Sequence, residues 1–101
     1  MAYGRCGKIV AVPGAGEELT GHLLEAADAL QAVESCRLYL VNRLREEPDA
    51  VWVVEVWKDA EAHRASLQLP AVQQLIGRAR HLIAAMPDAF EMVPVGGKGL
   101  A

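Results

Sequence analysis

The stretch AVWVVEVWKDAEAH, residues 50–63, holds the side chains best suited to chemistry. Its first part is rich in β-branched and aromatic residues, which predicts a strand. Because side chains alternate across a strand, Val53, Glu55 and Trp57 share one face. A carboxylate in so apolar a strand is either buried with a partner or placed at the edge of a cavity. His63 follows on the next segment, and histidine is the side chain that titrates near neutral pH.

The segments around this strand predict a βαββαβ order. A Pro-Gly turn ends the first strand, and the apolar period then changes to the three- and four-residue steps of a helix. Asp59 is suited to cap the second helix, and Pro70 predicts a break in that helix near Leu69. Beyond the break, the helical stripe continues as far as Met86. The expected elements are strands over 4–12, 35–44, 51–57 and 90–95, and helices over 17–33 and 60–86.

In a chain of 101 residues, this order predicts an α+β fold, the ferredoxin-like sandwich with an antiparallel sheet and both helices on one face. In the second strand, alternation is expected to place Cys36 and Leu38 on one face and Tyr39 on the other. The strands carry apolar residues on both faces, so the face without helices needs a cover. A second copy of the chain would supply it, which predicts a homodimer. The domain is expected over residues 1–95, followed by a flexible Gly-rich tail over 96–101.

Composition argues against several classes of partner. The net charge is −3 and the chain has no basic cluster, so no nucleic-acid partner is expected. No run approaches the roughly 20 apolar residues that span a bilayer, and no secretion signal is recognised. The two cysteines have no CxxC spacing, so neither a metal site nor a disulfide scaffold is expected. These features predict a reduced, cytoplasmic protein without a membrane partner.

Three stretches resemble the antibiotic biosynthesis monooxygenase family: SCRLYL, EPD and VWVVEVWKDAEAH. The resemblance extends over nearly the whole chain and implies dimers of ferredoxin-like domains that form an α+β barrel. It also implies the oxidation of a small quinol or phenol by molecular oxygen, with no metal, flavin or other cofactor. The matching positions are Cys36, Tyr39, Pro48, Asp49, Glu55, Trp57 and Ala62.

The chain departs from the family pattern at several positions. Ser35 replaces the glycine before the cysteine, and Ser66 stands where members often have a histidine. Members that oxidise polyketide phenols have an asparagine where this chain has Val53, which counts against that activity. Haem-degrading members use an asparagine on the first strand, whereas the asparagine of this chain is Asn42. This difference counts against haem as the substrate.

The resemblance gives roles to the candidate residues. His63 would act as the base that deprotonates the substrate, with Trp57 and Glu55 beside it. Tyr39 would add a second aromatic wall, and Arg78 or Arg80 would stabilise an oxyanion. The residues predicted to be catalytic are His63, Trp57 and Glu55, and those predicted to bind substrate are Tyr39, Asn42, Val53, Ser66 and Arg78.

Two alternatives remain open at the level of sequence. Glu55 also fits a structural role, in which a bond to Tyr39, to a helix terminus or to an arginine fixes the sheet against the helices. The whole chain also fits a non-catalytic dimeric module, for instance in stress response, whose pocket holds a small aromatic molecule.

Overall fold

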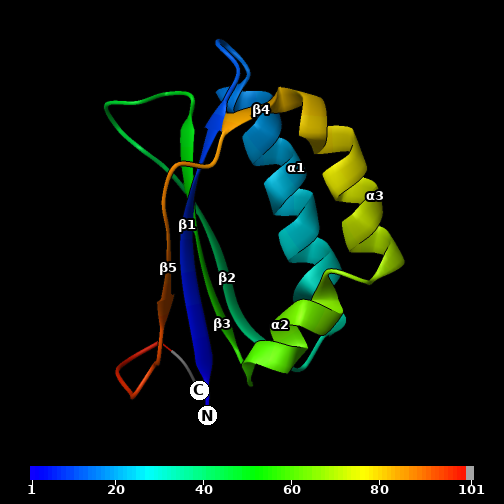
Figure 1. Ribbon diagram of the computed structural model, residues 1–101, viewed down its shortest axis with the longest axis vertical. Coiled ribbons are helices and arrows are strands. Elements are labelled where there is room, and N and C mark those ends of the chain that lie inside the picture. The colour runs from blue at the N-terminus through cyan, green and yellow to red at the C-terminus, as the bar shows by residue number, and fades with distance from the viewer. Residues whose placement is uncertain (100–101) are drawn as a thin grey trace.

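An antiparallel sheet with helices on one face forms the protein, as the element order predicts (Figure 1). The structure, a computed structural model, describes residues 1–99. Of the predicted tail over 96–101, Leu100 and Ala101 therefore lie outside the described residues. The strands are β1 (Tyr3–Ala11), β2 (Cys36–Arg43), β3 (Ala50–Trp57), β4 (Ile83–Ala85) and β5 (Ala89–Met92). The helices are α1 (Gly16–Ala29), α2 (Ala60–Ser66) and α3 (Pro70–Ala79), and short 3₁₀ turns, η1 (Leu30–Ala32) and η2 (Arg80–Leu82), follow α1 and α3.

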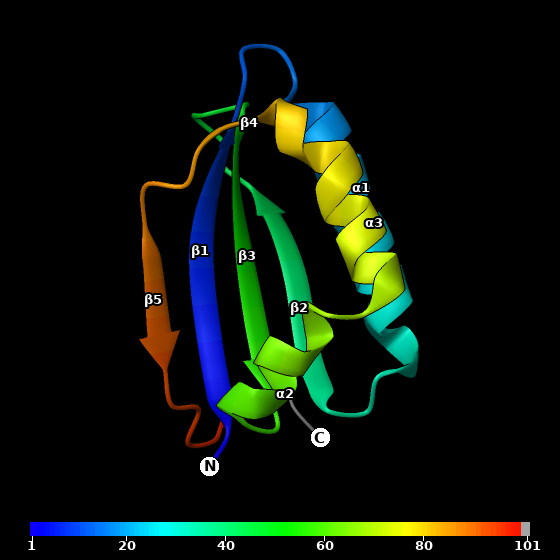
Figure 2. The same cartoon turned by 45° about the vertical axis from the view of Figure 1, so that its right-hand side comes forward.

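The sheet has the strand order β2-β3-β1, and both β4 and β5 pair with the far edge of β1. All of the pairings are antiparallel, and Figure 2 shows β5, β1, β3 and β2 side by side. β5 corresponds to the last predicted strand, 90–95, and β4 is an additional strand, so this edge of the sheet is interrupted between them. Pro87 lies in the interruption, where the Lys8 amide donates to the Asp88 carbonyl at 2.8 Å and keeps the two edges together. Proline cannot donate to a strand ladder, which favours a break there.

The helix ends follow from side chains that accept hydrogen bonds from backbone amides. Asp59 caps α2 as predicted, because its carboxylate accepts a 2.8 Å hydrogen bond from the Ala62 amide. The predicted break is confirmed, since α2 ends at Ser66 and α3 begins at Pro70. The start of α1 has no such local cap. Instead, Asp49 from the β2–β3 turn accepts from the amides of Gly14 and Gly16 at 3.1 and 3.0 Å.

The predicted helical stripe up to Met86 is wrong at its end. The helix α3 stops at Ala79, and Ile83 begins a strand that pairs with Ala11 of β1. The amide of Val12 donates to the Leu82 carbonyl at 2.8 Å, so pairing with β1 replaces the helical hydrogen bonds of this segment. A strand of three residues is too short to give a recognisable period of two.

The prediction that Cys36 shares a face with Leu38 is also wrong. Cys36 is opposite Trp57 and Leu38 is opposite Val56, so the register shifts between them. The bulge inserts Arg37 as an extra residue and reverses the alternation. Cys36 therefore packs against the core around Trp57, on the same side of the sheet as Tyr39.

The two faces of the sheet have different environments. Helices cover the face that carries Val51, Val53 and Trp57, and these three side chains are buried. The opposite face, which we call the outer face, has no helix over it and is nonetheless apolar (Figure 1). Its apolar side chains are those of Cys6, Val10, Leu38, Leu40, Trp52, Val54, Val56, Phe90 and Met92. Within residues 1–99, no helix has the length and apolar character needed to cross a membrane.

Candidate functional site

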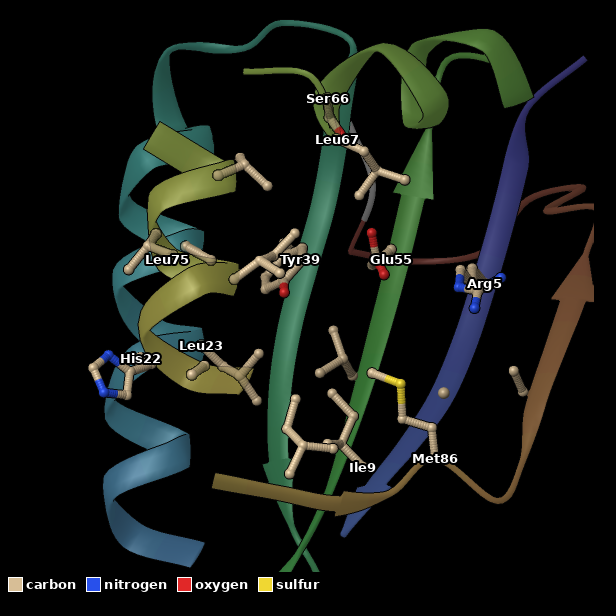
Figure 3. Close-up of a pocket in the computed structure, with 18 of the residues that line it drawn as sticks. Arg5, Ile9, His22, Leu23, Tyr39, Glu55, Ser66, Leu67, Leu75 and Met86 are labelled. Carbon is tan, nitrogen blue, oxygen red and sulfur yellow. The ribbon is translucent and has the colours of Figure 1, made fainter. Parts of the chain in front are cut away.

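A cavity of about 700 Å³ lies between the sheet and the helices. Its walls are mainly apolar, with contributions from α1, α3 and the helix-facing sides of β1, β2 and β3. Figure 3 shows Leu23 and Leu75 facing the sheet from the two long helices. Ser66 and Leu67 close the end near α2, and Met86 lies toward the other end. A cavity of this size and character suits a small aromatic molecule.

Glu55 lies on the cavity wall and is held there by Trp57. The indole Nε1–H of Trp57 donates to Glu55 Oε1 at 3.0 Å, and both residues extend from the same face of β3. Trp57 has no solvent exposure, whereas the Glu55 side chain keeps 15%. The alternation of β3 therefore placed these residues correctly, and the charge in the strand has a hydrogen-bonded partner beside the cavity.

His63 approaches the same carboxylate from α2. Its Nε2 lies 3.8 Å from Glu55 Oε1, too far for a hydrogen bond, and its side chain is 13% exposed. The ring packs against Tyr3 at 5.3 Å and edge-on against Trp57 at 5.8 Å between centroids. Burial lowers the pKa of His63 below its ordinary value, and nearby Glu55 opposes part of that shift. The imidazole is therefore neutral at pH 7 and can accept a proton.

Tyr39 lines the cavity from β2, directly opposite Glu55 in the strand register. Burial, together with the nearby charges of Glu55 and Cys36, raises the pKa of Tyr39 well above its ordinary value. Its hydroxyl therefore stays protonated and acts as a hydrogen-bond donor at every physiological pH. Burial and Glu55 also raise the pKa of Cys36, so its thiol is not activated as a nucleophile.

Two residues predicted to bind substrate lie away from the cavity. Asn42 extends to the outer face, where its amide donates to the Trp52 carbonyl at 3.2 Å. Arg78 lies on the exposed side of α3 and forms a 3.1 Å ion pair with Glu25 of α1. The oxyanion role was predicted for Arg78 or Arg80. It has no support at Arg78, which does not line the cavity, whereas Arg80 does line it.

Val53 and Ser66, two of the residues predicted to bind substrate, line the cavity. Val53 is an apolar part of the floor and is 4% exposed. Ser66 is buried, and its hydroxyl donates to the His63 carbonyl at 2.6 Å within α2. That bond fixes the turn that carries the imidazole, so Ser66 acts on the position of His63.

Sequence reasoning missed two cavity-side residues of β1. Tyr3 packs on the His63 ring, and Arg5 lines the cavity opposite Glu55 in the register. Alternation in β1 would have grouped Tyr3, Arg5, Gly7 and Ile9 on one face. The sequence contains no signal, however, for which residue of β3 lies opposite Arg5.

The arrangement combines a neutral base, a protonated hydroxyl and aromatic walls around an apolar space. Such a site can bind a phenol and remove its proton. Within residues 1–99, no group of three or more His, Cys, Asp or Glu side chains is placed to hold a metal ion.

The fold recurs in solved structures. A candidate antibiotic biosynthesis monooxygenase from Chloroflexus aurantiacus is 42% identical to this chain, with a TM-score of 0.92 and complete coverage of both chains. A candidate member from Deinococcus radiodurans is 24% identical, with a TM-score of 0.78 over 100% of this chain and 99% of that one. A third, from Bacteroides thetaiotaomicron, is 15% identical, with a TM-score of 0.86 over 99% and 95%. The last two likenesses establish the fold alone.

A match to a family model shows which protein family the chain belongs to. Curated protein sequences include no significant match to this chain. The model of the antibiotic biosynthesis monooxygenase family matches residues 5–78, which include most of β1, the β2–β3 hairpin, Glu55, Trp57 and His63. The chain therefore belongs to the antibiotic biosynthesis monooxygenase family and has its general monooxygenase-like role.

Proposed function

We propose that the protein oxidises a small quinol or phenol with molecular oxygen, without a cofactor, in the cavity between sheet and helices. The observation that carries this proposal is the neutral His63 imidazole beside Glu55 at the wall of an apolar cavity. A neutral imidazole can take the phenolic proton, and the nearby carboxylate then stabilises the imidazolium that forms.

The proposed reaction needs no external reductant. His63 removes a proton from a hydroquinone hydroxyl, and the resulting anion passes one electron to oxygen. The semiquinone and superoxide combine at a ring carbon to give a peroxide anion, which takes the proton back from protonated His63. The O–O bond of this hydroperoxide then breaks, and its hydroxide leaves as water with the hydrogen of the same ring carbon, which becomes a carbonyl. One hydroquinone and one O₂ thus give one hydroxyquinone and one water. Apolar walls keep bulk water away from the radical pair.

The proposal includes a homodimer formed through the outer face. Leu40, Phe90 and Met92 on this face are 49, 56 and 43% exposed, and the ring of Trp52 stacks with that of Phe90 at 6.3 Å. Exposed apolar surface of this extent is typical of a protein–protein interface. Apposition of two such sheets would cover it and give a barrel of two copies.

The decisive experiment measures oxygen uptake by metal-free protein with a panel of hydroquinones. We expect uptake with at least one of them, with the hydroxyquinone as product. His63→Ala should lower kcat/KM by about 10²–10⁴-fold, the usual contribution of a general base. His81→Ala is the matched control, because His81 is exposed on η2 and does not line the cavity.

The failed outcomes have distinct meanings. Uptake that is unchanged in His63→Ala would remove the imidazole from the mechanism. Absence of uptake with every hydroquinone, together with saturable binding of the same compounds, would replace the oxidation with the binding-module function.

A further inference from the structure

Arg5 is a cation of the cavity wall that has no protein acceptor among the described residues. It is the third residue of β1 and lines the cavity, where Figure 3 labels it. Lys8 pairs with Glu47 at 3.0 Å and Arg78 with Glu25 at 3.1 Å, whereas Arg80, also on the wall, resembles Arg5 in having no such partner among the described residues. Within residues 1–99, the Arg5 guanidinium forms neither an ion pair nor a side-chain hydrogen bond.

The two carboxylates nearest to Arg5 along the sheet are already placed elsewhere. Glu55 on β3 and Glu91 on β5 are its partners in the strand register. Glu55 directs Oε1 toward Trp57 and His63, and Glu91 belongs to an exposed strand. Both balance the charge of Arg5 from a distance, so the arginine can remain in the wall without a bound ligand.

An acceptor for Arg5 must therefore come from within the cavity or from water. A guanidinium is always charged and has five N–H donors in a fork that fits a carboxylate. In a mainly apolar cavity, a hydrogen-bonded anion is favoured over partial hydration, because charge-assisted bonds strengthen as water is excluded. Of the remaining charged groups on the wall, Arg80 would add to the attraction of an anion and Asp88 would oppose it.

Arg5, Glu55 and Tyr39 form one row across β1, β3 and β2 (Figure 3). Neighbouring strands are roughly 5 Å apart, so Arg5 lies about one strand spacing from the carboxylate that contacts His63. A single aromatic ring can span this row with a hydroxyl at His63 and an acidic group at Arg5. Tyr39, on the far side of the row, offers its protonated hydroxyl to a second ring oxygen.

We propose that the cavity selects hydroxyaromatic acids, and that Arg5 is the residue that binds their carboxylate. This inference rests on the proposed function for the reaction, but the binding itself does not require oxidation. It assigns to β1 the anion-binding role that the sequence had suggested for Arg78 or Arg80.

The test compares gentisate, a hydroquinone that carries a carboxylate, with its uncharged methyl ester. Binding is measured without oxygen by calorimetry, and turnover by oxygen uptake. We expect the wild-type chain to bind gentisate at least about tenfold more tightly than the ester, the effect of one charge-assisted contact. Arg5→Met should remove this preference, and Arg5→Lys should retain part of it because it keeps the charge and loses the fork.

Arg78→Met is the matched control, because it removes the same charge from a surface helix outside the cavity. It should keep the preference for gentisate. Equal binding of acid and ester by the wild-type chain would overturn the inference, and this comparison needs no folded variant. The same preference in Arg5→Met as in wild type would also overturn it.

The inference and the proposed function fail in different ways. If the acid and the ester are oxidised with equal kcat/KM, the proposed function is retained and the proposed anion site is rejected. If gentisate binds in an Arg5-dependent way but no oxygen is taken up, the anion site is retained and the proposed oxidation is rejected.

Discussion

Trp57 donates its indole hydrogen to Glu55 two residues earlier on β3, at 3.0 Å, and so holds the carboxylate against the wall of the cavity. The charge in this apolar strand thus has one partner in the core and faces His63 with the same oxygen. A structural and a chemical role for Glu55 are therefore compatible, because the bond to Trp57 sets the position from which the carboxylate acts on His63.

Replacement of Trp57 by phenylalanine should uncouple these roles. The variant loses a hydrogen bond to a charged group and leaves a void in the core, so we expect a loss of about 2–4 kcal/mol in unfolding free energy. A double-mutant cycle with Glu55→Met, which removes the acceptor and is measured by urea denaturation, isolates the pair. If the two single effects simply add, the bond makes no contribution to stability.

The pKa of His63 should respond in opposite directions to the loss of two of its charged neighbours, Glu55 and Arg5. Burial places the pKa of His63 below 6.5, Glu55 raises the pKa and Arg5 lowers it. Glu55→Gln should therefore lower the pKa further, and Arg5→Met should raise it. NMR titration of the imidazole proton measures both shifts. Shifts in the same direction for the two variants would contradict this electrostatic arrangement.

The same pKa predicts a loss of stability in acid. The folded state binds the His63 proton less tightly than the unfolded state, whose histidine titrates near 6.5. The stability contributed by neutral His63 is therefore complete above that pH and is lost as the pH falls toward the folded pKa. Urea midpoints between pH 8 and 5 should fall more steeply for the wild-type chain than for His63→Phe. Parallel curves would show that the imidazole titrates alike in both states.

Asp49 should contribute more to the free energy of unfolding than an ordinary turn residue does. Its carboxylate accepts from the amides of Gly14 and Gly16, and its removal leaves the start of α1 without these acceptors. We expect Asp49→Ala to cost about 1–2 kcal/mol, as for a helix cap. Asp28→Ala, on an exposed part of α1, is the control. Equal urea midpoints for the two variants would show that the capping bonds contribute nothing.

Gly16→Ala tests the same junction by steric overlap. A Cβ at this position would lie 2.2 Å from the Pro48 carbonyl oxygen, so the turn or the helix must move. We expect a loss of roughly 1–3 kcal/mol, the usual cost of overpacking. Gly21→Ala is the matched control, because it lies on the same helix with open space around it. Thermal unfolding should separate the two variants, and a Gly16→Ala chain as stable as Gly21→Ala would contradict the close approach.

A charge on the outer face should break the proposed dimer. Leu40→Glu places a carboxylate on the outer face, on the edge strand β2, where a second sheet would bury it without a partner. Light scattering should then give the mass of one chain, against two for wild type. Leu24→Glu is the control, because Leu24 is similarly exposed on α1, away from the sheet. A wild-type monomer would refute the interface.

The sequence predicted the structure correctly where local periodicity decides it. The predictions failed where contacts between distant segments decide the structure. Alternation placed Glu55 and Trp57 together and Val53 beside them, because β3 is regular. It failed at Cys36, since the bulge at Arg37 depends on how β2 aligns with β3. The end of α3 was missed for the same reason, because pairing with β1 decides it.

Only some residues of the candidate site could be predicted from the sequence. Asn42 shares its parity with Leu40, so alternation itself placed it away from Tyr39. Arg78 borders the apolar stripe of α3, but a helical pattern alone cannot tell a residue at a cavity mouth from one that pairs with a neighbouring helix. Arg5 was missed because its importance depends on the register between β1 and β3, which no local pattern determines.

The bonds from Asp49 to the start of α1 also bear on how the chain reaches its native state. They join residues 33 and 35 positions apart, across the whole of α1 and β2. The first helix can therefore acquire its cap only after the β2–β3 hairpin has been made and docked. Local helix formation and long-range loop closure become one cooperative event, which favours a folding nucleus that contains both segments.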